Sequence, residues 1–181
     1  MTFNPDIHHR KSIRLPEYDY SGSGYYFITI CTCQKLPLFG DVVEGTMNLN
    51  EMGQIVESEL QAISSKQNHI FIDCFVIMPN HLHGILILSE AVGARFIAPN
   101  LSKSQYSRKG AMNGAPTIGK IIHDFKARCT HAINHHRNSK GTPVWQRNYY
   151  ERIIRNEVEL RNIREYIQNN PAQWALNDLY V

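Results

Sequence analysis

The sequence has little of the features that mark membrane or secreted proteins. No apolar run approaches the roughly 18 residues that a membrane-spanning helix needs, and the first ten residues show no signal-peptide pattern. There are only four cysteines, and none forms a Cys-x-x-Cys pair. These absences predict no membrane association and a reducing, cytoplasmic compartment, in which the cysteines act as small hydrophobic residues.

Acidic residues are scarce in one part of the chain. Between residues 91 and 117 there are four basic residues and no acidic one. From residue 118 to residue 155, eight basic residues face only Asp124 and Glu151. A positive region of this kind favours an anionic partner such as the phosphate backbone of a nucleic acid.

The composition otherwise fits a globular protein with a sizeable core. The chain has 181 residues, of which 43% are hydrophobic and 19% charged, and its formal net charge is only +3. Residues 89–117 are rich in Ser, Gly, Ala, Asn and Pro. We therefore expect one domain over residues 1–181, with a flexible insertion loop at 89–117.

Hydrophobic periodicity predicts the element order β-α-β-β-α-β-α. The first six elements match the ferredoxin-like split βαβ plan, an α+β fold in which helices pack on one face of an antiparallel sheet. The last helix can then lie against the other face, which is free to carry a site. The predicted strands cover 25–33, 70–78, 81–88 and 149–155, and the predicted helices follow Asn50 or cover 118–136 and 157–169.

Two histidines lie in the predicted strand 81–88. Only Leu82 separates His81 from His83, so a strand places both imidazoles on one face, with Cα atoms roughly 6.5 Å apart. Such a pair can bind one divalent metal, and it can equally be two satisfied polar residues of a sheet. The metal interpretation needs a nucleophile and a nucleic-acid surface elsewhere in the chain.

The predicted last helix offers both a nucleophile and a further ligand. Its packing stripe is Leu160, Ile163 and Ile167, with Tyr166 beside the stripe and Asn170 one turn later. If this helix covers the open sheet face, the phenol and the amide oxygen both approach the histidine pair. Two imidazoles and an oxygen ligand suit Mg²⁺ or Mn²⁺, which would assist attack of the tyrosine on a phosphodiester.

Three blocks of sequence, in this order, resemble the single-tyrosine HUH transposases, and in particular their REP-associated branch (REP, repetitive extragenic palindrome). The resemblance covers most of the chain from Arg10 to Trp174 outside the loop 89–117. The three blocks are MPNHLHG at 78–84, VWQRNYYERIIR at 144–155 and REYIQNNP at 164–171.

The resemblance implies a role for each of these candidate residues. In that family the histidine pair binds the metal, a polar helix residue completes its coordination, and the helix tyrosine cleaves single-stranded DNA. Here the metal ligands would be His81, His83 and Asn170, and the catalytic nucleophile would be Tyr166. Tyr149 and Tyr150 are alternative nucleophiles, or else serve in sheet packing or as a base-stacking platform.

The function implied is that of a metal-dependent transposase. It would cleave and rejoin single-stranded hairpin DNA, from palindromic extragenic repeats or element ends, through a 5′-phosphotyrosine intermediate. The sequence leaves both a monomer and a homodimer open. Two alternatives share the same residues: a rolling-circle initiator or relaxase-like nickase, and a domesticated hairpin-binding protein that does not cleave DNA in the cell.

Basic residues outside the site are the candidates for DNA binding. They lie in a cluster near the N-terminus and on the predicted helix 118–136, and their contacts with phosphates would make binding sensitive to salt. The basic residues of the loop 91–117 are an alternative surface. The predicted DNA-binding residues are Arg10, Lys11, Arg14, Lys120, Lys126 and Arg128.

Overall fold

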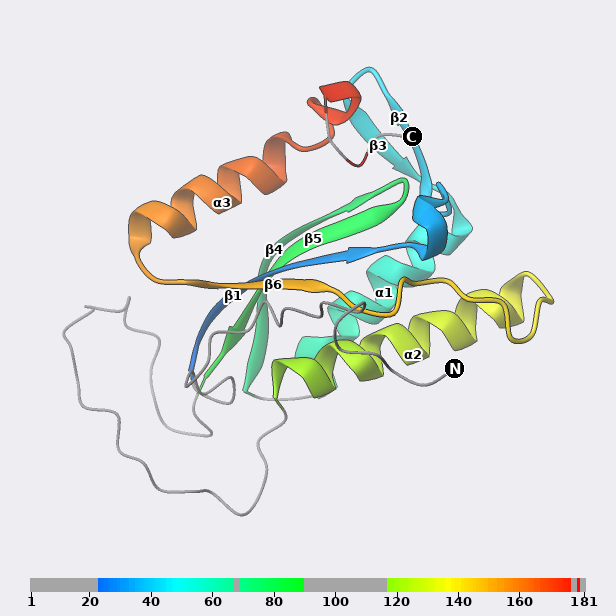
Figure 1. Cartoon of the computed structure of the whole chain (residues 1–181), viewed down its shortest axis with the longest axis horizontal. Coiled ribbons are helices and arrows are strands. Elements are labelled where there is room, and N and C mark those ends of the chain that lie inside the picture. The colour runs from blue at the N-terminus through cyan, green and yellow to red at the C-terminus, as the bar shows by residue number, and fades with distance from the viewer. Residues whose placement is uncertain (1–22, 67–68, 90–116, 177–178, 180–181) are drawn as a thin grey trace, which may run out of the picture.

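The computed structural model describes residues 23–66, 69–89, 117–176 and 179 (Figure 1). Its centre is a four-stranded antiparallel sheet with the strand order β4-β5-β1-β6, which confirms the predicted ferredoxin-like plan. The strands of this sheet are β1 (Gly24–Cys31), β4 (Ile70–Met78), β5 (His81–Leu88) and β6 (Tyr150–Ile154). The helices are α1 (Glu51–Lys66), α2 (Ile118–His136) and α3 (Glu157–Asn169).

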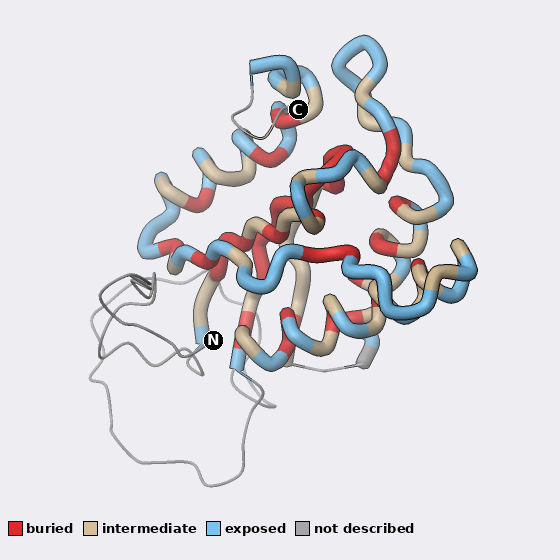
Figure 2. The backbone as a smooth tube through the Cα atoms, turned by 45° about the vertical axis from the view of Figure 1, so that its right-hand side comes forward, coloured by how far each residue is buried: buried red, intermediate tan, exposed pale blue. Residues whose placement is uncertain are grey.

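The sheet has a helical layer on each face, as Figure 1 shows. On one face α1 and α2 enclose the main hydrophobic core, to which β1 contributes Tyr26, Ile28 and Ile30. On the other face α3 covers a smaller cluster that includes Phe27 and Ile85. Buried residues accordingly follow the strands and the inward sides of the helices (Figure 2). Alternation along β1 therefore divides its side chains between two cores.

A second, two-stranded sheet was not predicted. It is a hairpin of β2 (Gly40–Val43) and β3 (Thr46–Leu49), joined by Glu44 and Gly45, which both have positive φ. Two such residues form the tight turn that fits the twist of a hairpin. Gly40 also has a positive φ, and a Cβ there would lie 2.0 Å from the backbone oxygen of Asn48, so this position requires glycine.

An N-terminal cap and an ion pair hold α3 over the sheet. At its start, the Asn156 side chain accepts a hydrogen bond from the Glu159 amide at 2.8 Å and caps the helix. The Glu159 carboxylate accepts a hydrogen bond from the backbone amide of Arg155. In the middle of α3, Arg164 makes a bidentate ion pair with Asp73, with a distance of 2.7 Å from Nε to Oδ2. Asp73 stands at an irregularity in β4, between Ile72 and Cys74.

Most predicted boundaries agree with the structure. The strands 70–78 and 81–88 and the helices 118–136 and 157–169 are as predicted, and Asn50 caps α1 by accepting a hydrogen bond from the Gly53 amide. The prediction was wrong at the end of the first strand, because Cys33 begins a short 3₁₀ helix, η1 (Cys33–Lys35). The predicted loop 89–117 lies outside the described residues, apart from its first and last residue. None of the helices that the structure describes has the length and apolar character to cross a bilayer.

Candidate active site

His81 and His83 lie side by side on the sheet face that α3 covers. Both side chains project from the same sheet face as Ile85, which α3 covers. Leu82, between them, projects from the other face into the main core. Their ring centroids are 4.6 Å apart, and the two residues are 0% and 3% exposed. The predicted placement of the two imidazoles on one face is therefore confirmed.

Asn80 fixes the protonation of the His81 ring. The Asn80 amide nitrogen donates to the carbonyls of Lys35 and Leu179, so its Oδ1 faces His81 and can only accept a hydrogen bond. His81 Nδ1 lies 2.8 Å from this oxygen and must therefore carry the proton. The lone pair of the ring is then on Nε2, a buried atom without a hydrogen-bond partner among the described residues.

His83 lies between a hydroxyl of β1 and the phenol of α3. Its Nδ1 is 2.8 Å from Thr29 Oγ1, and its Nε2 is 3.1 Å from the hydroxyl of Tyr166. Thr29 and His83 are directly paired residues of β1 and β5. Tyr166 is 42% exposed, so its hydroxyl meets the buried imidazole at the border with solvent.

Burial keeps both imidazoles unprotonated at neutral pH. It lowers the pKa of His81 to about 4, against a smaller, opposing effect of the Asn170 side chain. Burial also lowers the pKa of His83 to about 3, and the neighbouring His81 adds to this shift. A neutral imidazole with a lone pair is the form that binds metal ions.

The donor set fits a divalent cation that prefers nitrogen and oxygen ligands. His81 Nε2 is buried and has no hydrogen-bond partner among the described residues, and the side chain of Asn170, which is 1% exposed, influences the pKa of the same ring. Over the described residues, no group of three His, Cys, Asp or Glu side chains could hold a metal ion. Within that part of the chain, the amide oxygen of Asn170 is the candidate for a third protein ligand.

One solved structure shares the fold of this chain. A REP-associated tyrosine transposase, solved bound to a REP hairpin, superposes with a TM-score of 0.58 at 19% identity, over 91% of this chain and 74% of that chain. This chain has the tyrosine-transposase fold. A candidate transposase from Deinococcus radiodurans R1 has a TM-score of 0.43 at 15% identity, over 87% of this chain and 97% of that chain.

At the level of sequence, the chain is 46% identical to a Haemophilus influenzae protein described as uncharacterised, over 180 residues that make up 99% of this chain and 97% of that protein. The chain belongs to the same family as that protein. No protein-family model matches the chain.

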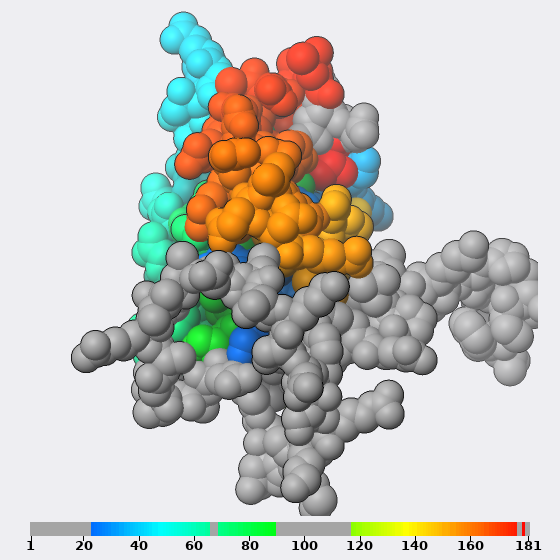
Figure 3. All heavy atoms as spheres, turned by 90° about the vertical axis from the view of Figure 1, so that its left-hand side faces the viewer, coloured from blue at the N-terminus to red at the C-terminus, as the bar shows by residue number. Residues whose placement is uncertain are grey.

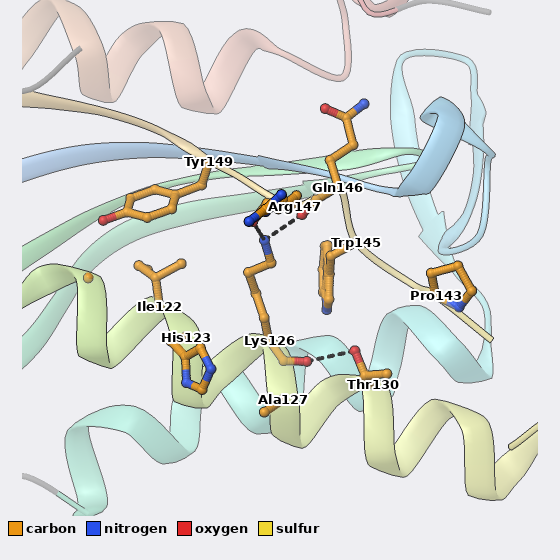
Figure 4. Close-up of a pocket in the computed structure, with 11 residues that line it drawn as sticks. Ile122, His123, Lys126, Ala127, Thr130, Pro143, Trp145, Gln146, Arg147 and Tyr149 are labelled. Atoms are coloured by element: carbon orange, nitrogen blue, oxygen red, sulfur yellow. Dashed lines mark hydrogen bonds between the residues drawn. The ribbon is translucent and has the colours of Figure 1, made fainter. Parts of the chain in front are cut away.

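In this tyrosine-transposase fold, the basic residues predicted on α2 lie on the sheet face opposite the histidines, and each has a partner within the chain. Lys120 pairs with Asp124, and Arg128 with Glu59. Lys126 donates to the carbonyls of residues 146–148, beside a pocket of about 450 Å³ between α2 and residues 143–149 (Figure 4). Their binding to DNA stays a prediction.

The N-terminal cluster of predicted DNA-binding residues, Arg10, Lys11 and Arg14, lies outside the described residues. Sequence reasoning did not identify Asn80 and Thr29, which orient the two imidazoles. The strand alternation that places His83 on one face also places Thr29 there, so the pairing of β1 with β5 would have revealed it.

Proposed function

We propose that the protein is a metal-dependent transposase that cleaves and rejoins single-stranded DNA through Tyr166. The observation that carries this proposal is the 3.1 Å contact between the Tyr166 hydroxyl and Nε2 of His83, beside the buried lone pair of His81. An exposed phenol next to two neutral imidazoles brings a nucleophile within reach of a metal site. The tyrosine-transposase fold supports the same assignment.

The proposed chemistry is a transfer of one phosphodiester bond. The Tyr166 oxygen attacks phosphorus, the bond from phosphorus to the 3′ oxygen breaks, and the downstream strand stays attached as a 5′-phosphotyrosine. The phenol loses a proton and the departing 3′ oxygen gains one, so no net proton is consumed. Rejoining is the reverse attack by a 3′ hydroxyl, and it requires no nucleotide cofactor.

Burial lowers the pKa of His83 to about 3, so the ring is neutral and keeps a lone pair that can bind a metal. His81, His83 and Asn170 would hold Mg²⁺ or Mn²⁺, with Asn80 and Thr29 keeping the rings in place. The bound cation would polarise the phosphate and neutralise charge that develops during the attack.

The substrate that we propose is a DNA hairpin with single-stranded flanks. The solved neighbour is described as bound to a REP hairpin, and that ligand is the basis for choosing a hairpin here. An unpaired flank is needed because the phosphate must reach a hydroxyl held against a buried histidine.

Detection of the covalent intermediate tests the proposal. Hairpin oligonucleotides with randomised single-stranded flanks, labelled at the 3′ end, are incubated with protein and Mn²⁺ and separated on a denaturing gel. We expect a labelled protein band that EDTA abolishes. Tyr166→Phe should abolish the band while leaving hairpin binding nearly unchanged, because only the hydroxyl forms the new bond.

Tyr150→Phe is the matched control, since Tyr150 is an exposed tyrosine on the same sheet face. It should retain the labelled band. A band that persists in Tyr166→Phe refutes the assignment of the nucleophile. The absence of a band in wild-type protein that binds the hairpin tightly in Mn²⁺ would favour a binding protein without cleavage.

A further inference from the structure

A row of three side chains leads from the candidate metal site to the edge of the sheet. Thr29 of β1 is paired with His83 on one side and with Tyr150 of β6 on the other. Directly paired residues of an antiparallel sheet project from the same face, so Tyr150 shares the face of His83, with their Cα atoms about 10 Å apart. Among the described strands of this sheet, β6 is at the edge.

One phenylalanine connects the two exposed tyrosines of this face. Phe27 stacks on His83, with 5.4 Å between ring centroids and 23° between ring planes. Tyr166 and Tyr150 each meet Phe27 edge-on, with 6.2 Å between centroids. A buried ring thus supports an exposed tyrosine on each of two elements, and fixes the position of both relative to His83.

The position of α3 explains why Tyr150 is exposed. Figure 3 shows α3, in orange, on the side of the molecule that faces the viewer. Among the described elements, the helix packs mainly against β4 and β5 rather than against β6. Tyr150 is 44% exposed although its ring stands beside a hydrophobic cluster. Arg152, two residues further along β6 on the same face, has a side chain that is 59% exposed and paired with Glu159.

We propose that Tyr150 is a stacking platform for an unpaired base of the strand whose phosphate reaches Tyr166. This inference rests on the proposed function and adds a positioning residue to it. An exposed ring supported from behind is the arrangement that stacks on bases of single strands, and such stacking tolerates any base. A base inside a duplex offers no free face, so the ligand is single-stranded DNA.

Tyr149 has a different role from its neighbour. It packs against the main core on the other face, and its hydroxyl donates to the buried carboxylate of Glu151. Its ring therefore lies on the sheet face opposite His83, away from the strand at Tyr166. The two adjacent tyrosines therefore divide between core packing and the platform, as the alternation of a strand requires.

Fluorescence anisotropy with the labelled single-stranded flank tests the platform. Tyr150→Ala should weaken binding about tenfold or more, which is the usual effect of losing one aromatic stacking partner. Tyr150→Phe should bind like wild-type protein, because the ring and not the hydroxyl stacks. Val158→Ala, which removes an exposed apolar side chain of α3, is the control and should have no effect.

A second measurement locates the base. A 2-aminopurine scan along the flank should show one position whose fluorescence is quenched by wild-type protein and recovers in Tyr150→Ala. Thermal melting of each variant confirms that it is folded.

The affinity and covalent-band measurements together distinguish the platform from the proposed function. Unchanged affinity of Tyr150→Ala, or failure of Tyr150→Phe to restore binding, overturns the platform. If wild-type protein forms no covalent band while the affinity still depends on the Tyr150 ring, the proposed function fails and the platform stands. A band lost in Tyr150→Phe and kept in Tyr166→Phe would make Tyr150 the nucleophile and overturn both proposals.

Discussion

Acidification from pH 7 to pH 5 should weaken the fold through His81 and His83. Burial lowers the pKa of these residues to about 4 and about 3, from a value of 6.5 outside the fold. Between pH 6.5 and pH 4 the unfolded chain therefore binds a proton at each residue that the folded chain does not bind. The stability present above pH 6.5 is lost as the pH falls through this window.

The size of the loss follows from the same values. At pH 5 an imidazole in the unfolded chain is almost fully protonated, whereas the same ring in the fold is almost fully neutral. Linkage then gives a loss of about 2 kcal/mol for each residue between pH 7 and pH 5, or about 4 kcal/mol for both. This is a large share of the 5–15 kcal/mol that roughly describes the stability of a typical domain.

Urea unfolding at pH 7, 6 and 5, in EDTA, measures this effect. His81→Gln and His83→Gln should each remove about half of the histidine-dependent loss of stability, because glutamine does not titrate. Comparing each variant with itself at two pH values cancels any constant cost of the substitution. His131→Gln, at an exposed position of α2, should lose as much stability as wild-type protein. An identical loss in wild-type protein and in both site variants would refute the reasoning.

Two further predictions concern the residues around the histidine pair. Leu82→Ala should lower the free energy of unfolding by about 2–5 kcal/mol, because its fully buried side chain packs in the main core; a change below about 0.5 kcal/mol in urea unfolding would contradict this packing. Asn80→Ala should weaken Mn²⁺ binding, measured by calorimetry, by about 10-fold or more, since Asn80 holds the lone pair of His81 on Nε2. Unchanged affinity would mean that the tautomer of His81 does not limit binding, and His81→Ala serves as the reference for loss of the site.

The sequence predicted the fold well where one periodicity dominates. In β5 the alternation of leucine with histidine indicated the strand and the shared face of His81 and His83. It did not predict the hairpin β2–β3, because four-residue strands carry little periodicity and Glu44-Gly45 lacks the Asn-Gly signature of such turns. The turn of this hairpin depends on the positive φ of Glu44 and Gly45, which the sequence alone does not reveal.

The candidate site was only partly predictable. A helical wheel placed Tyr166 beside the packing stripe of α3, but its contact with His83 depends on how the helix docks, which the ion pair of Arg164 with Asp73 helps to set. The basic residues of α2 are a similar case. They were predicted as DNA-binding residues, but Glu59, the partner of Arg128, is distant in sequence and is brought there by the tertiary fold.

The two cores of this protein are unequal, and the smaller one attaches the helix that carries Tyr166. Over the described residues, five buried side chains make up the cluster beneath α3, against twenty in the core beneath α1 and α2. From α3 itself, only Leu160 and Ile167 are buried. Local opening of α3 therefore costs far less free energy than global unfolding, and its amides should exchange with deuterium before those of β5. The hydroxyl can withdraw from the histidines and return while the sheet stays folded.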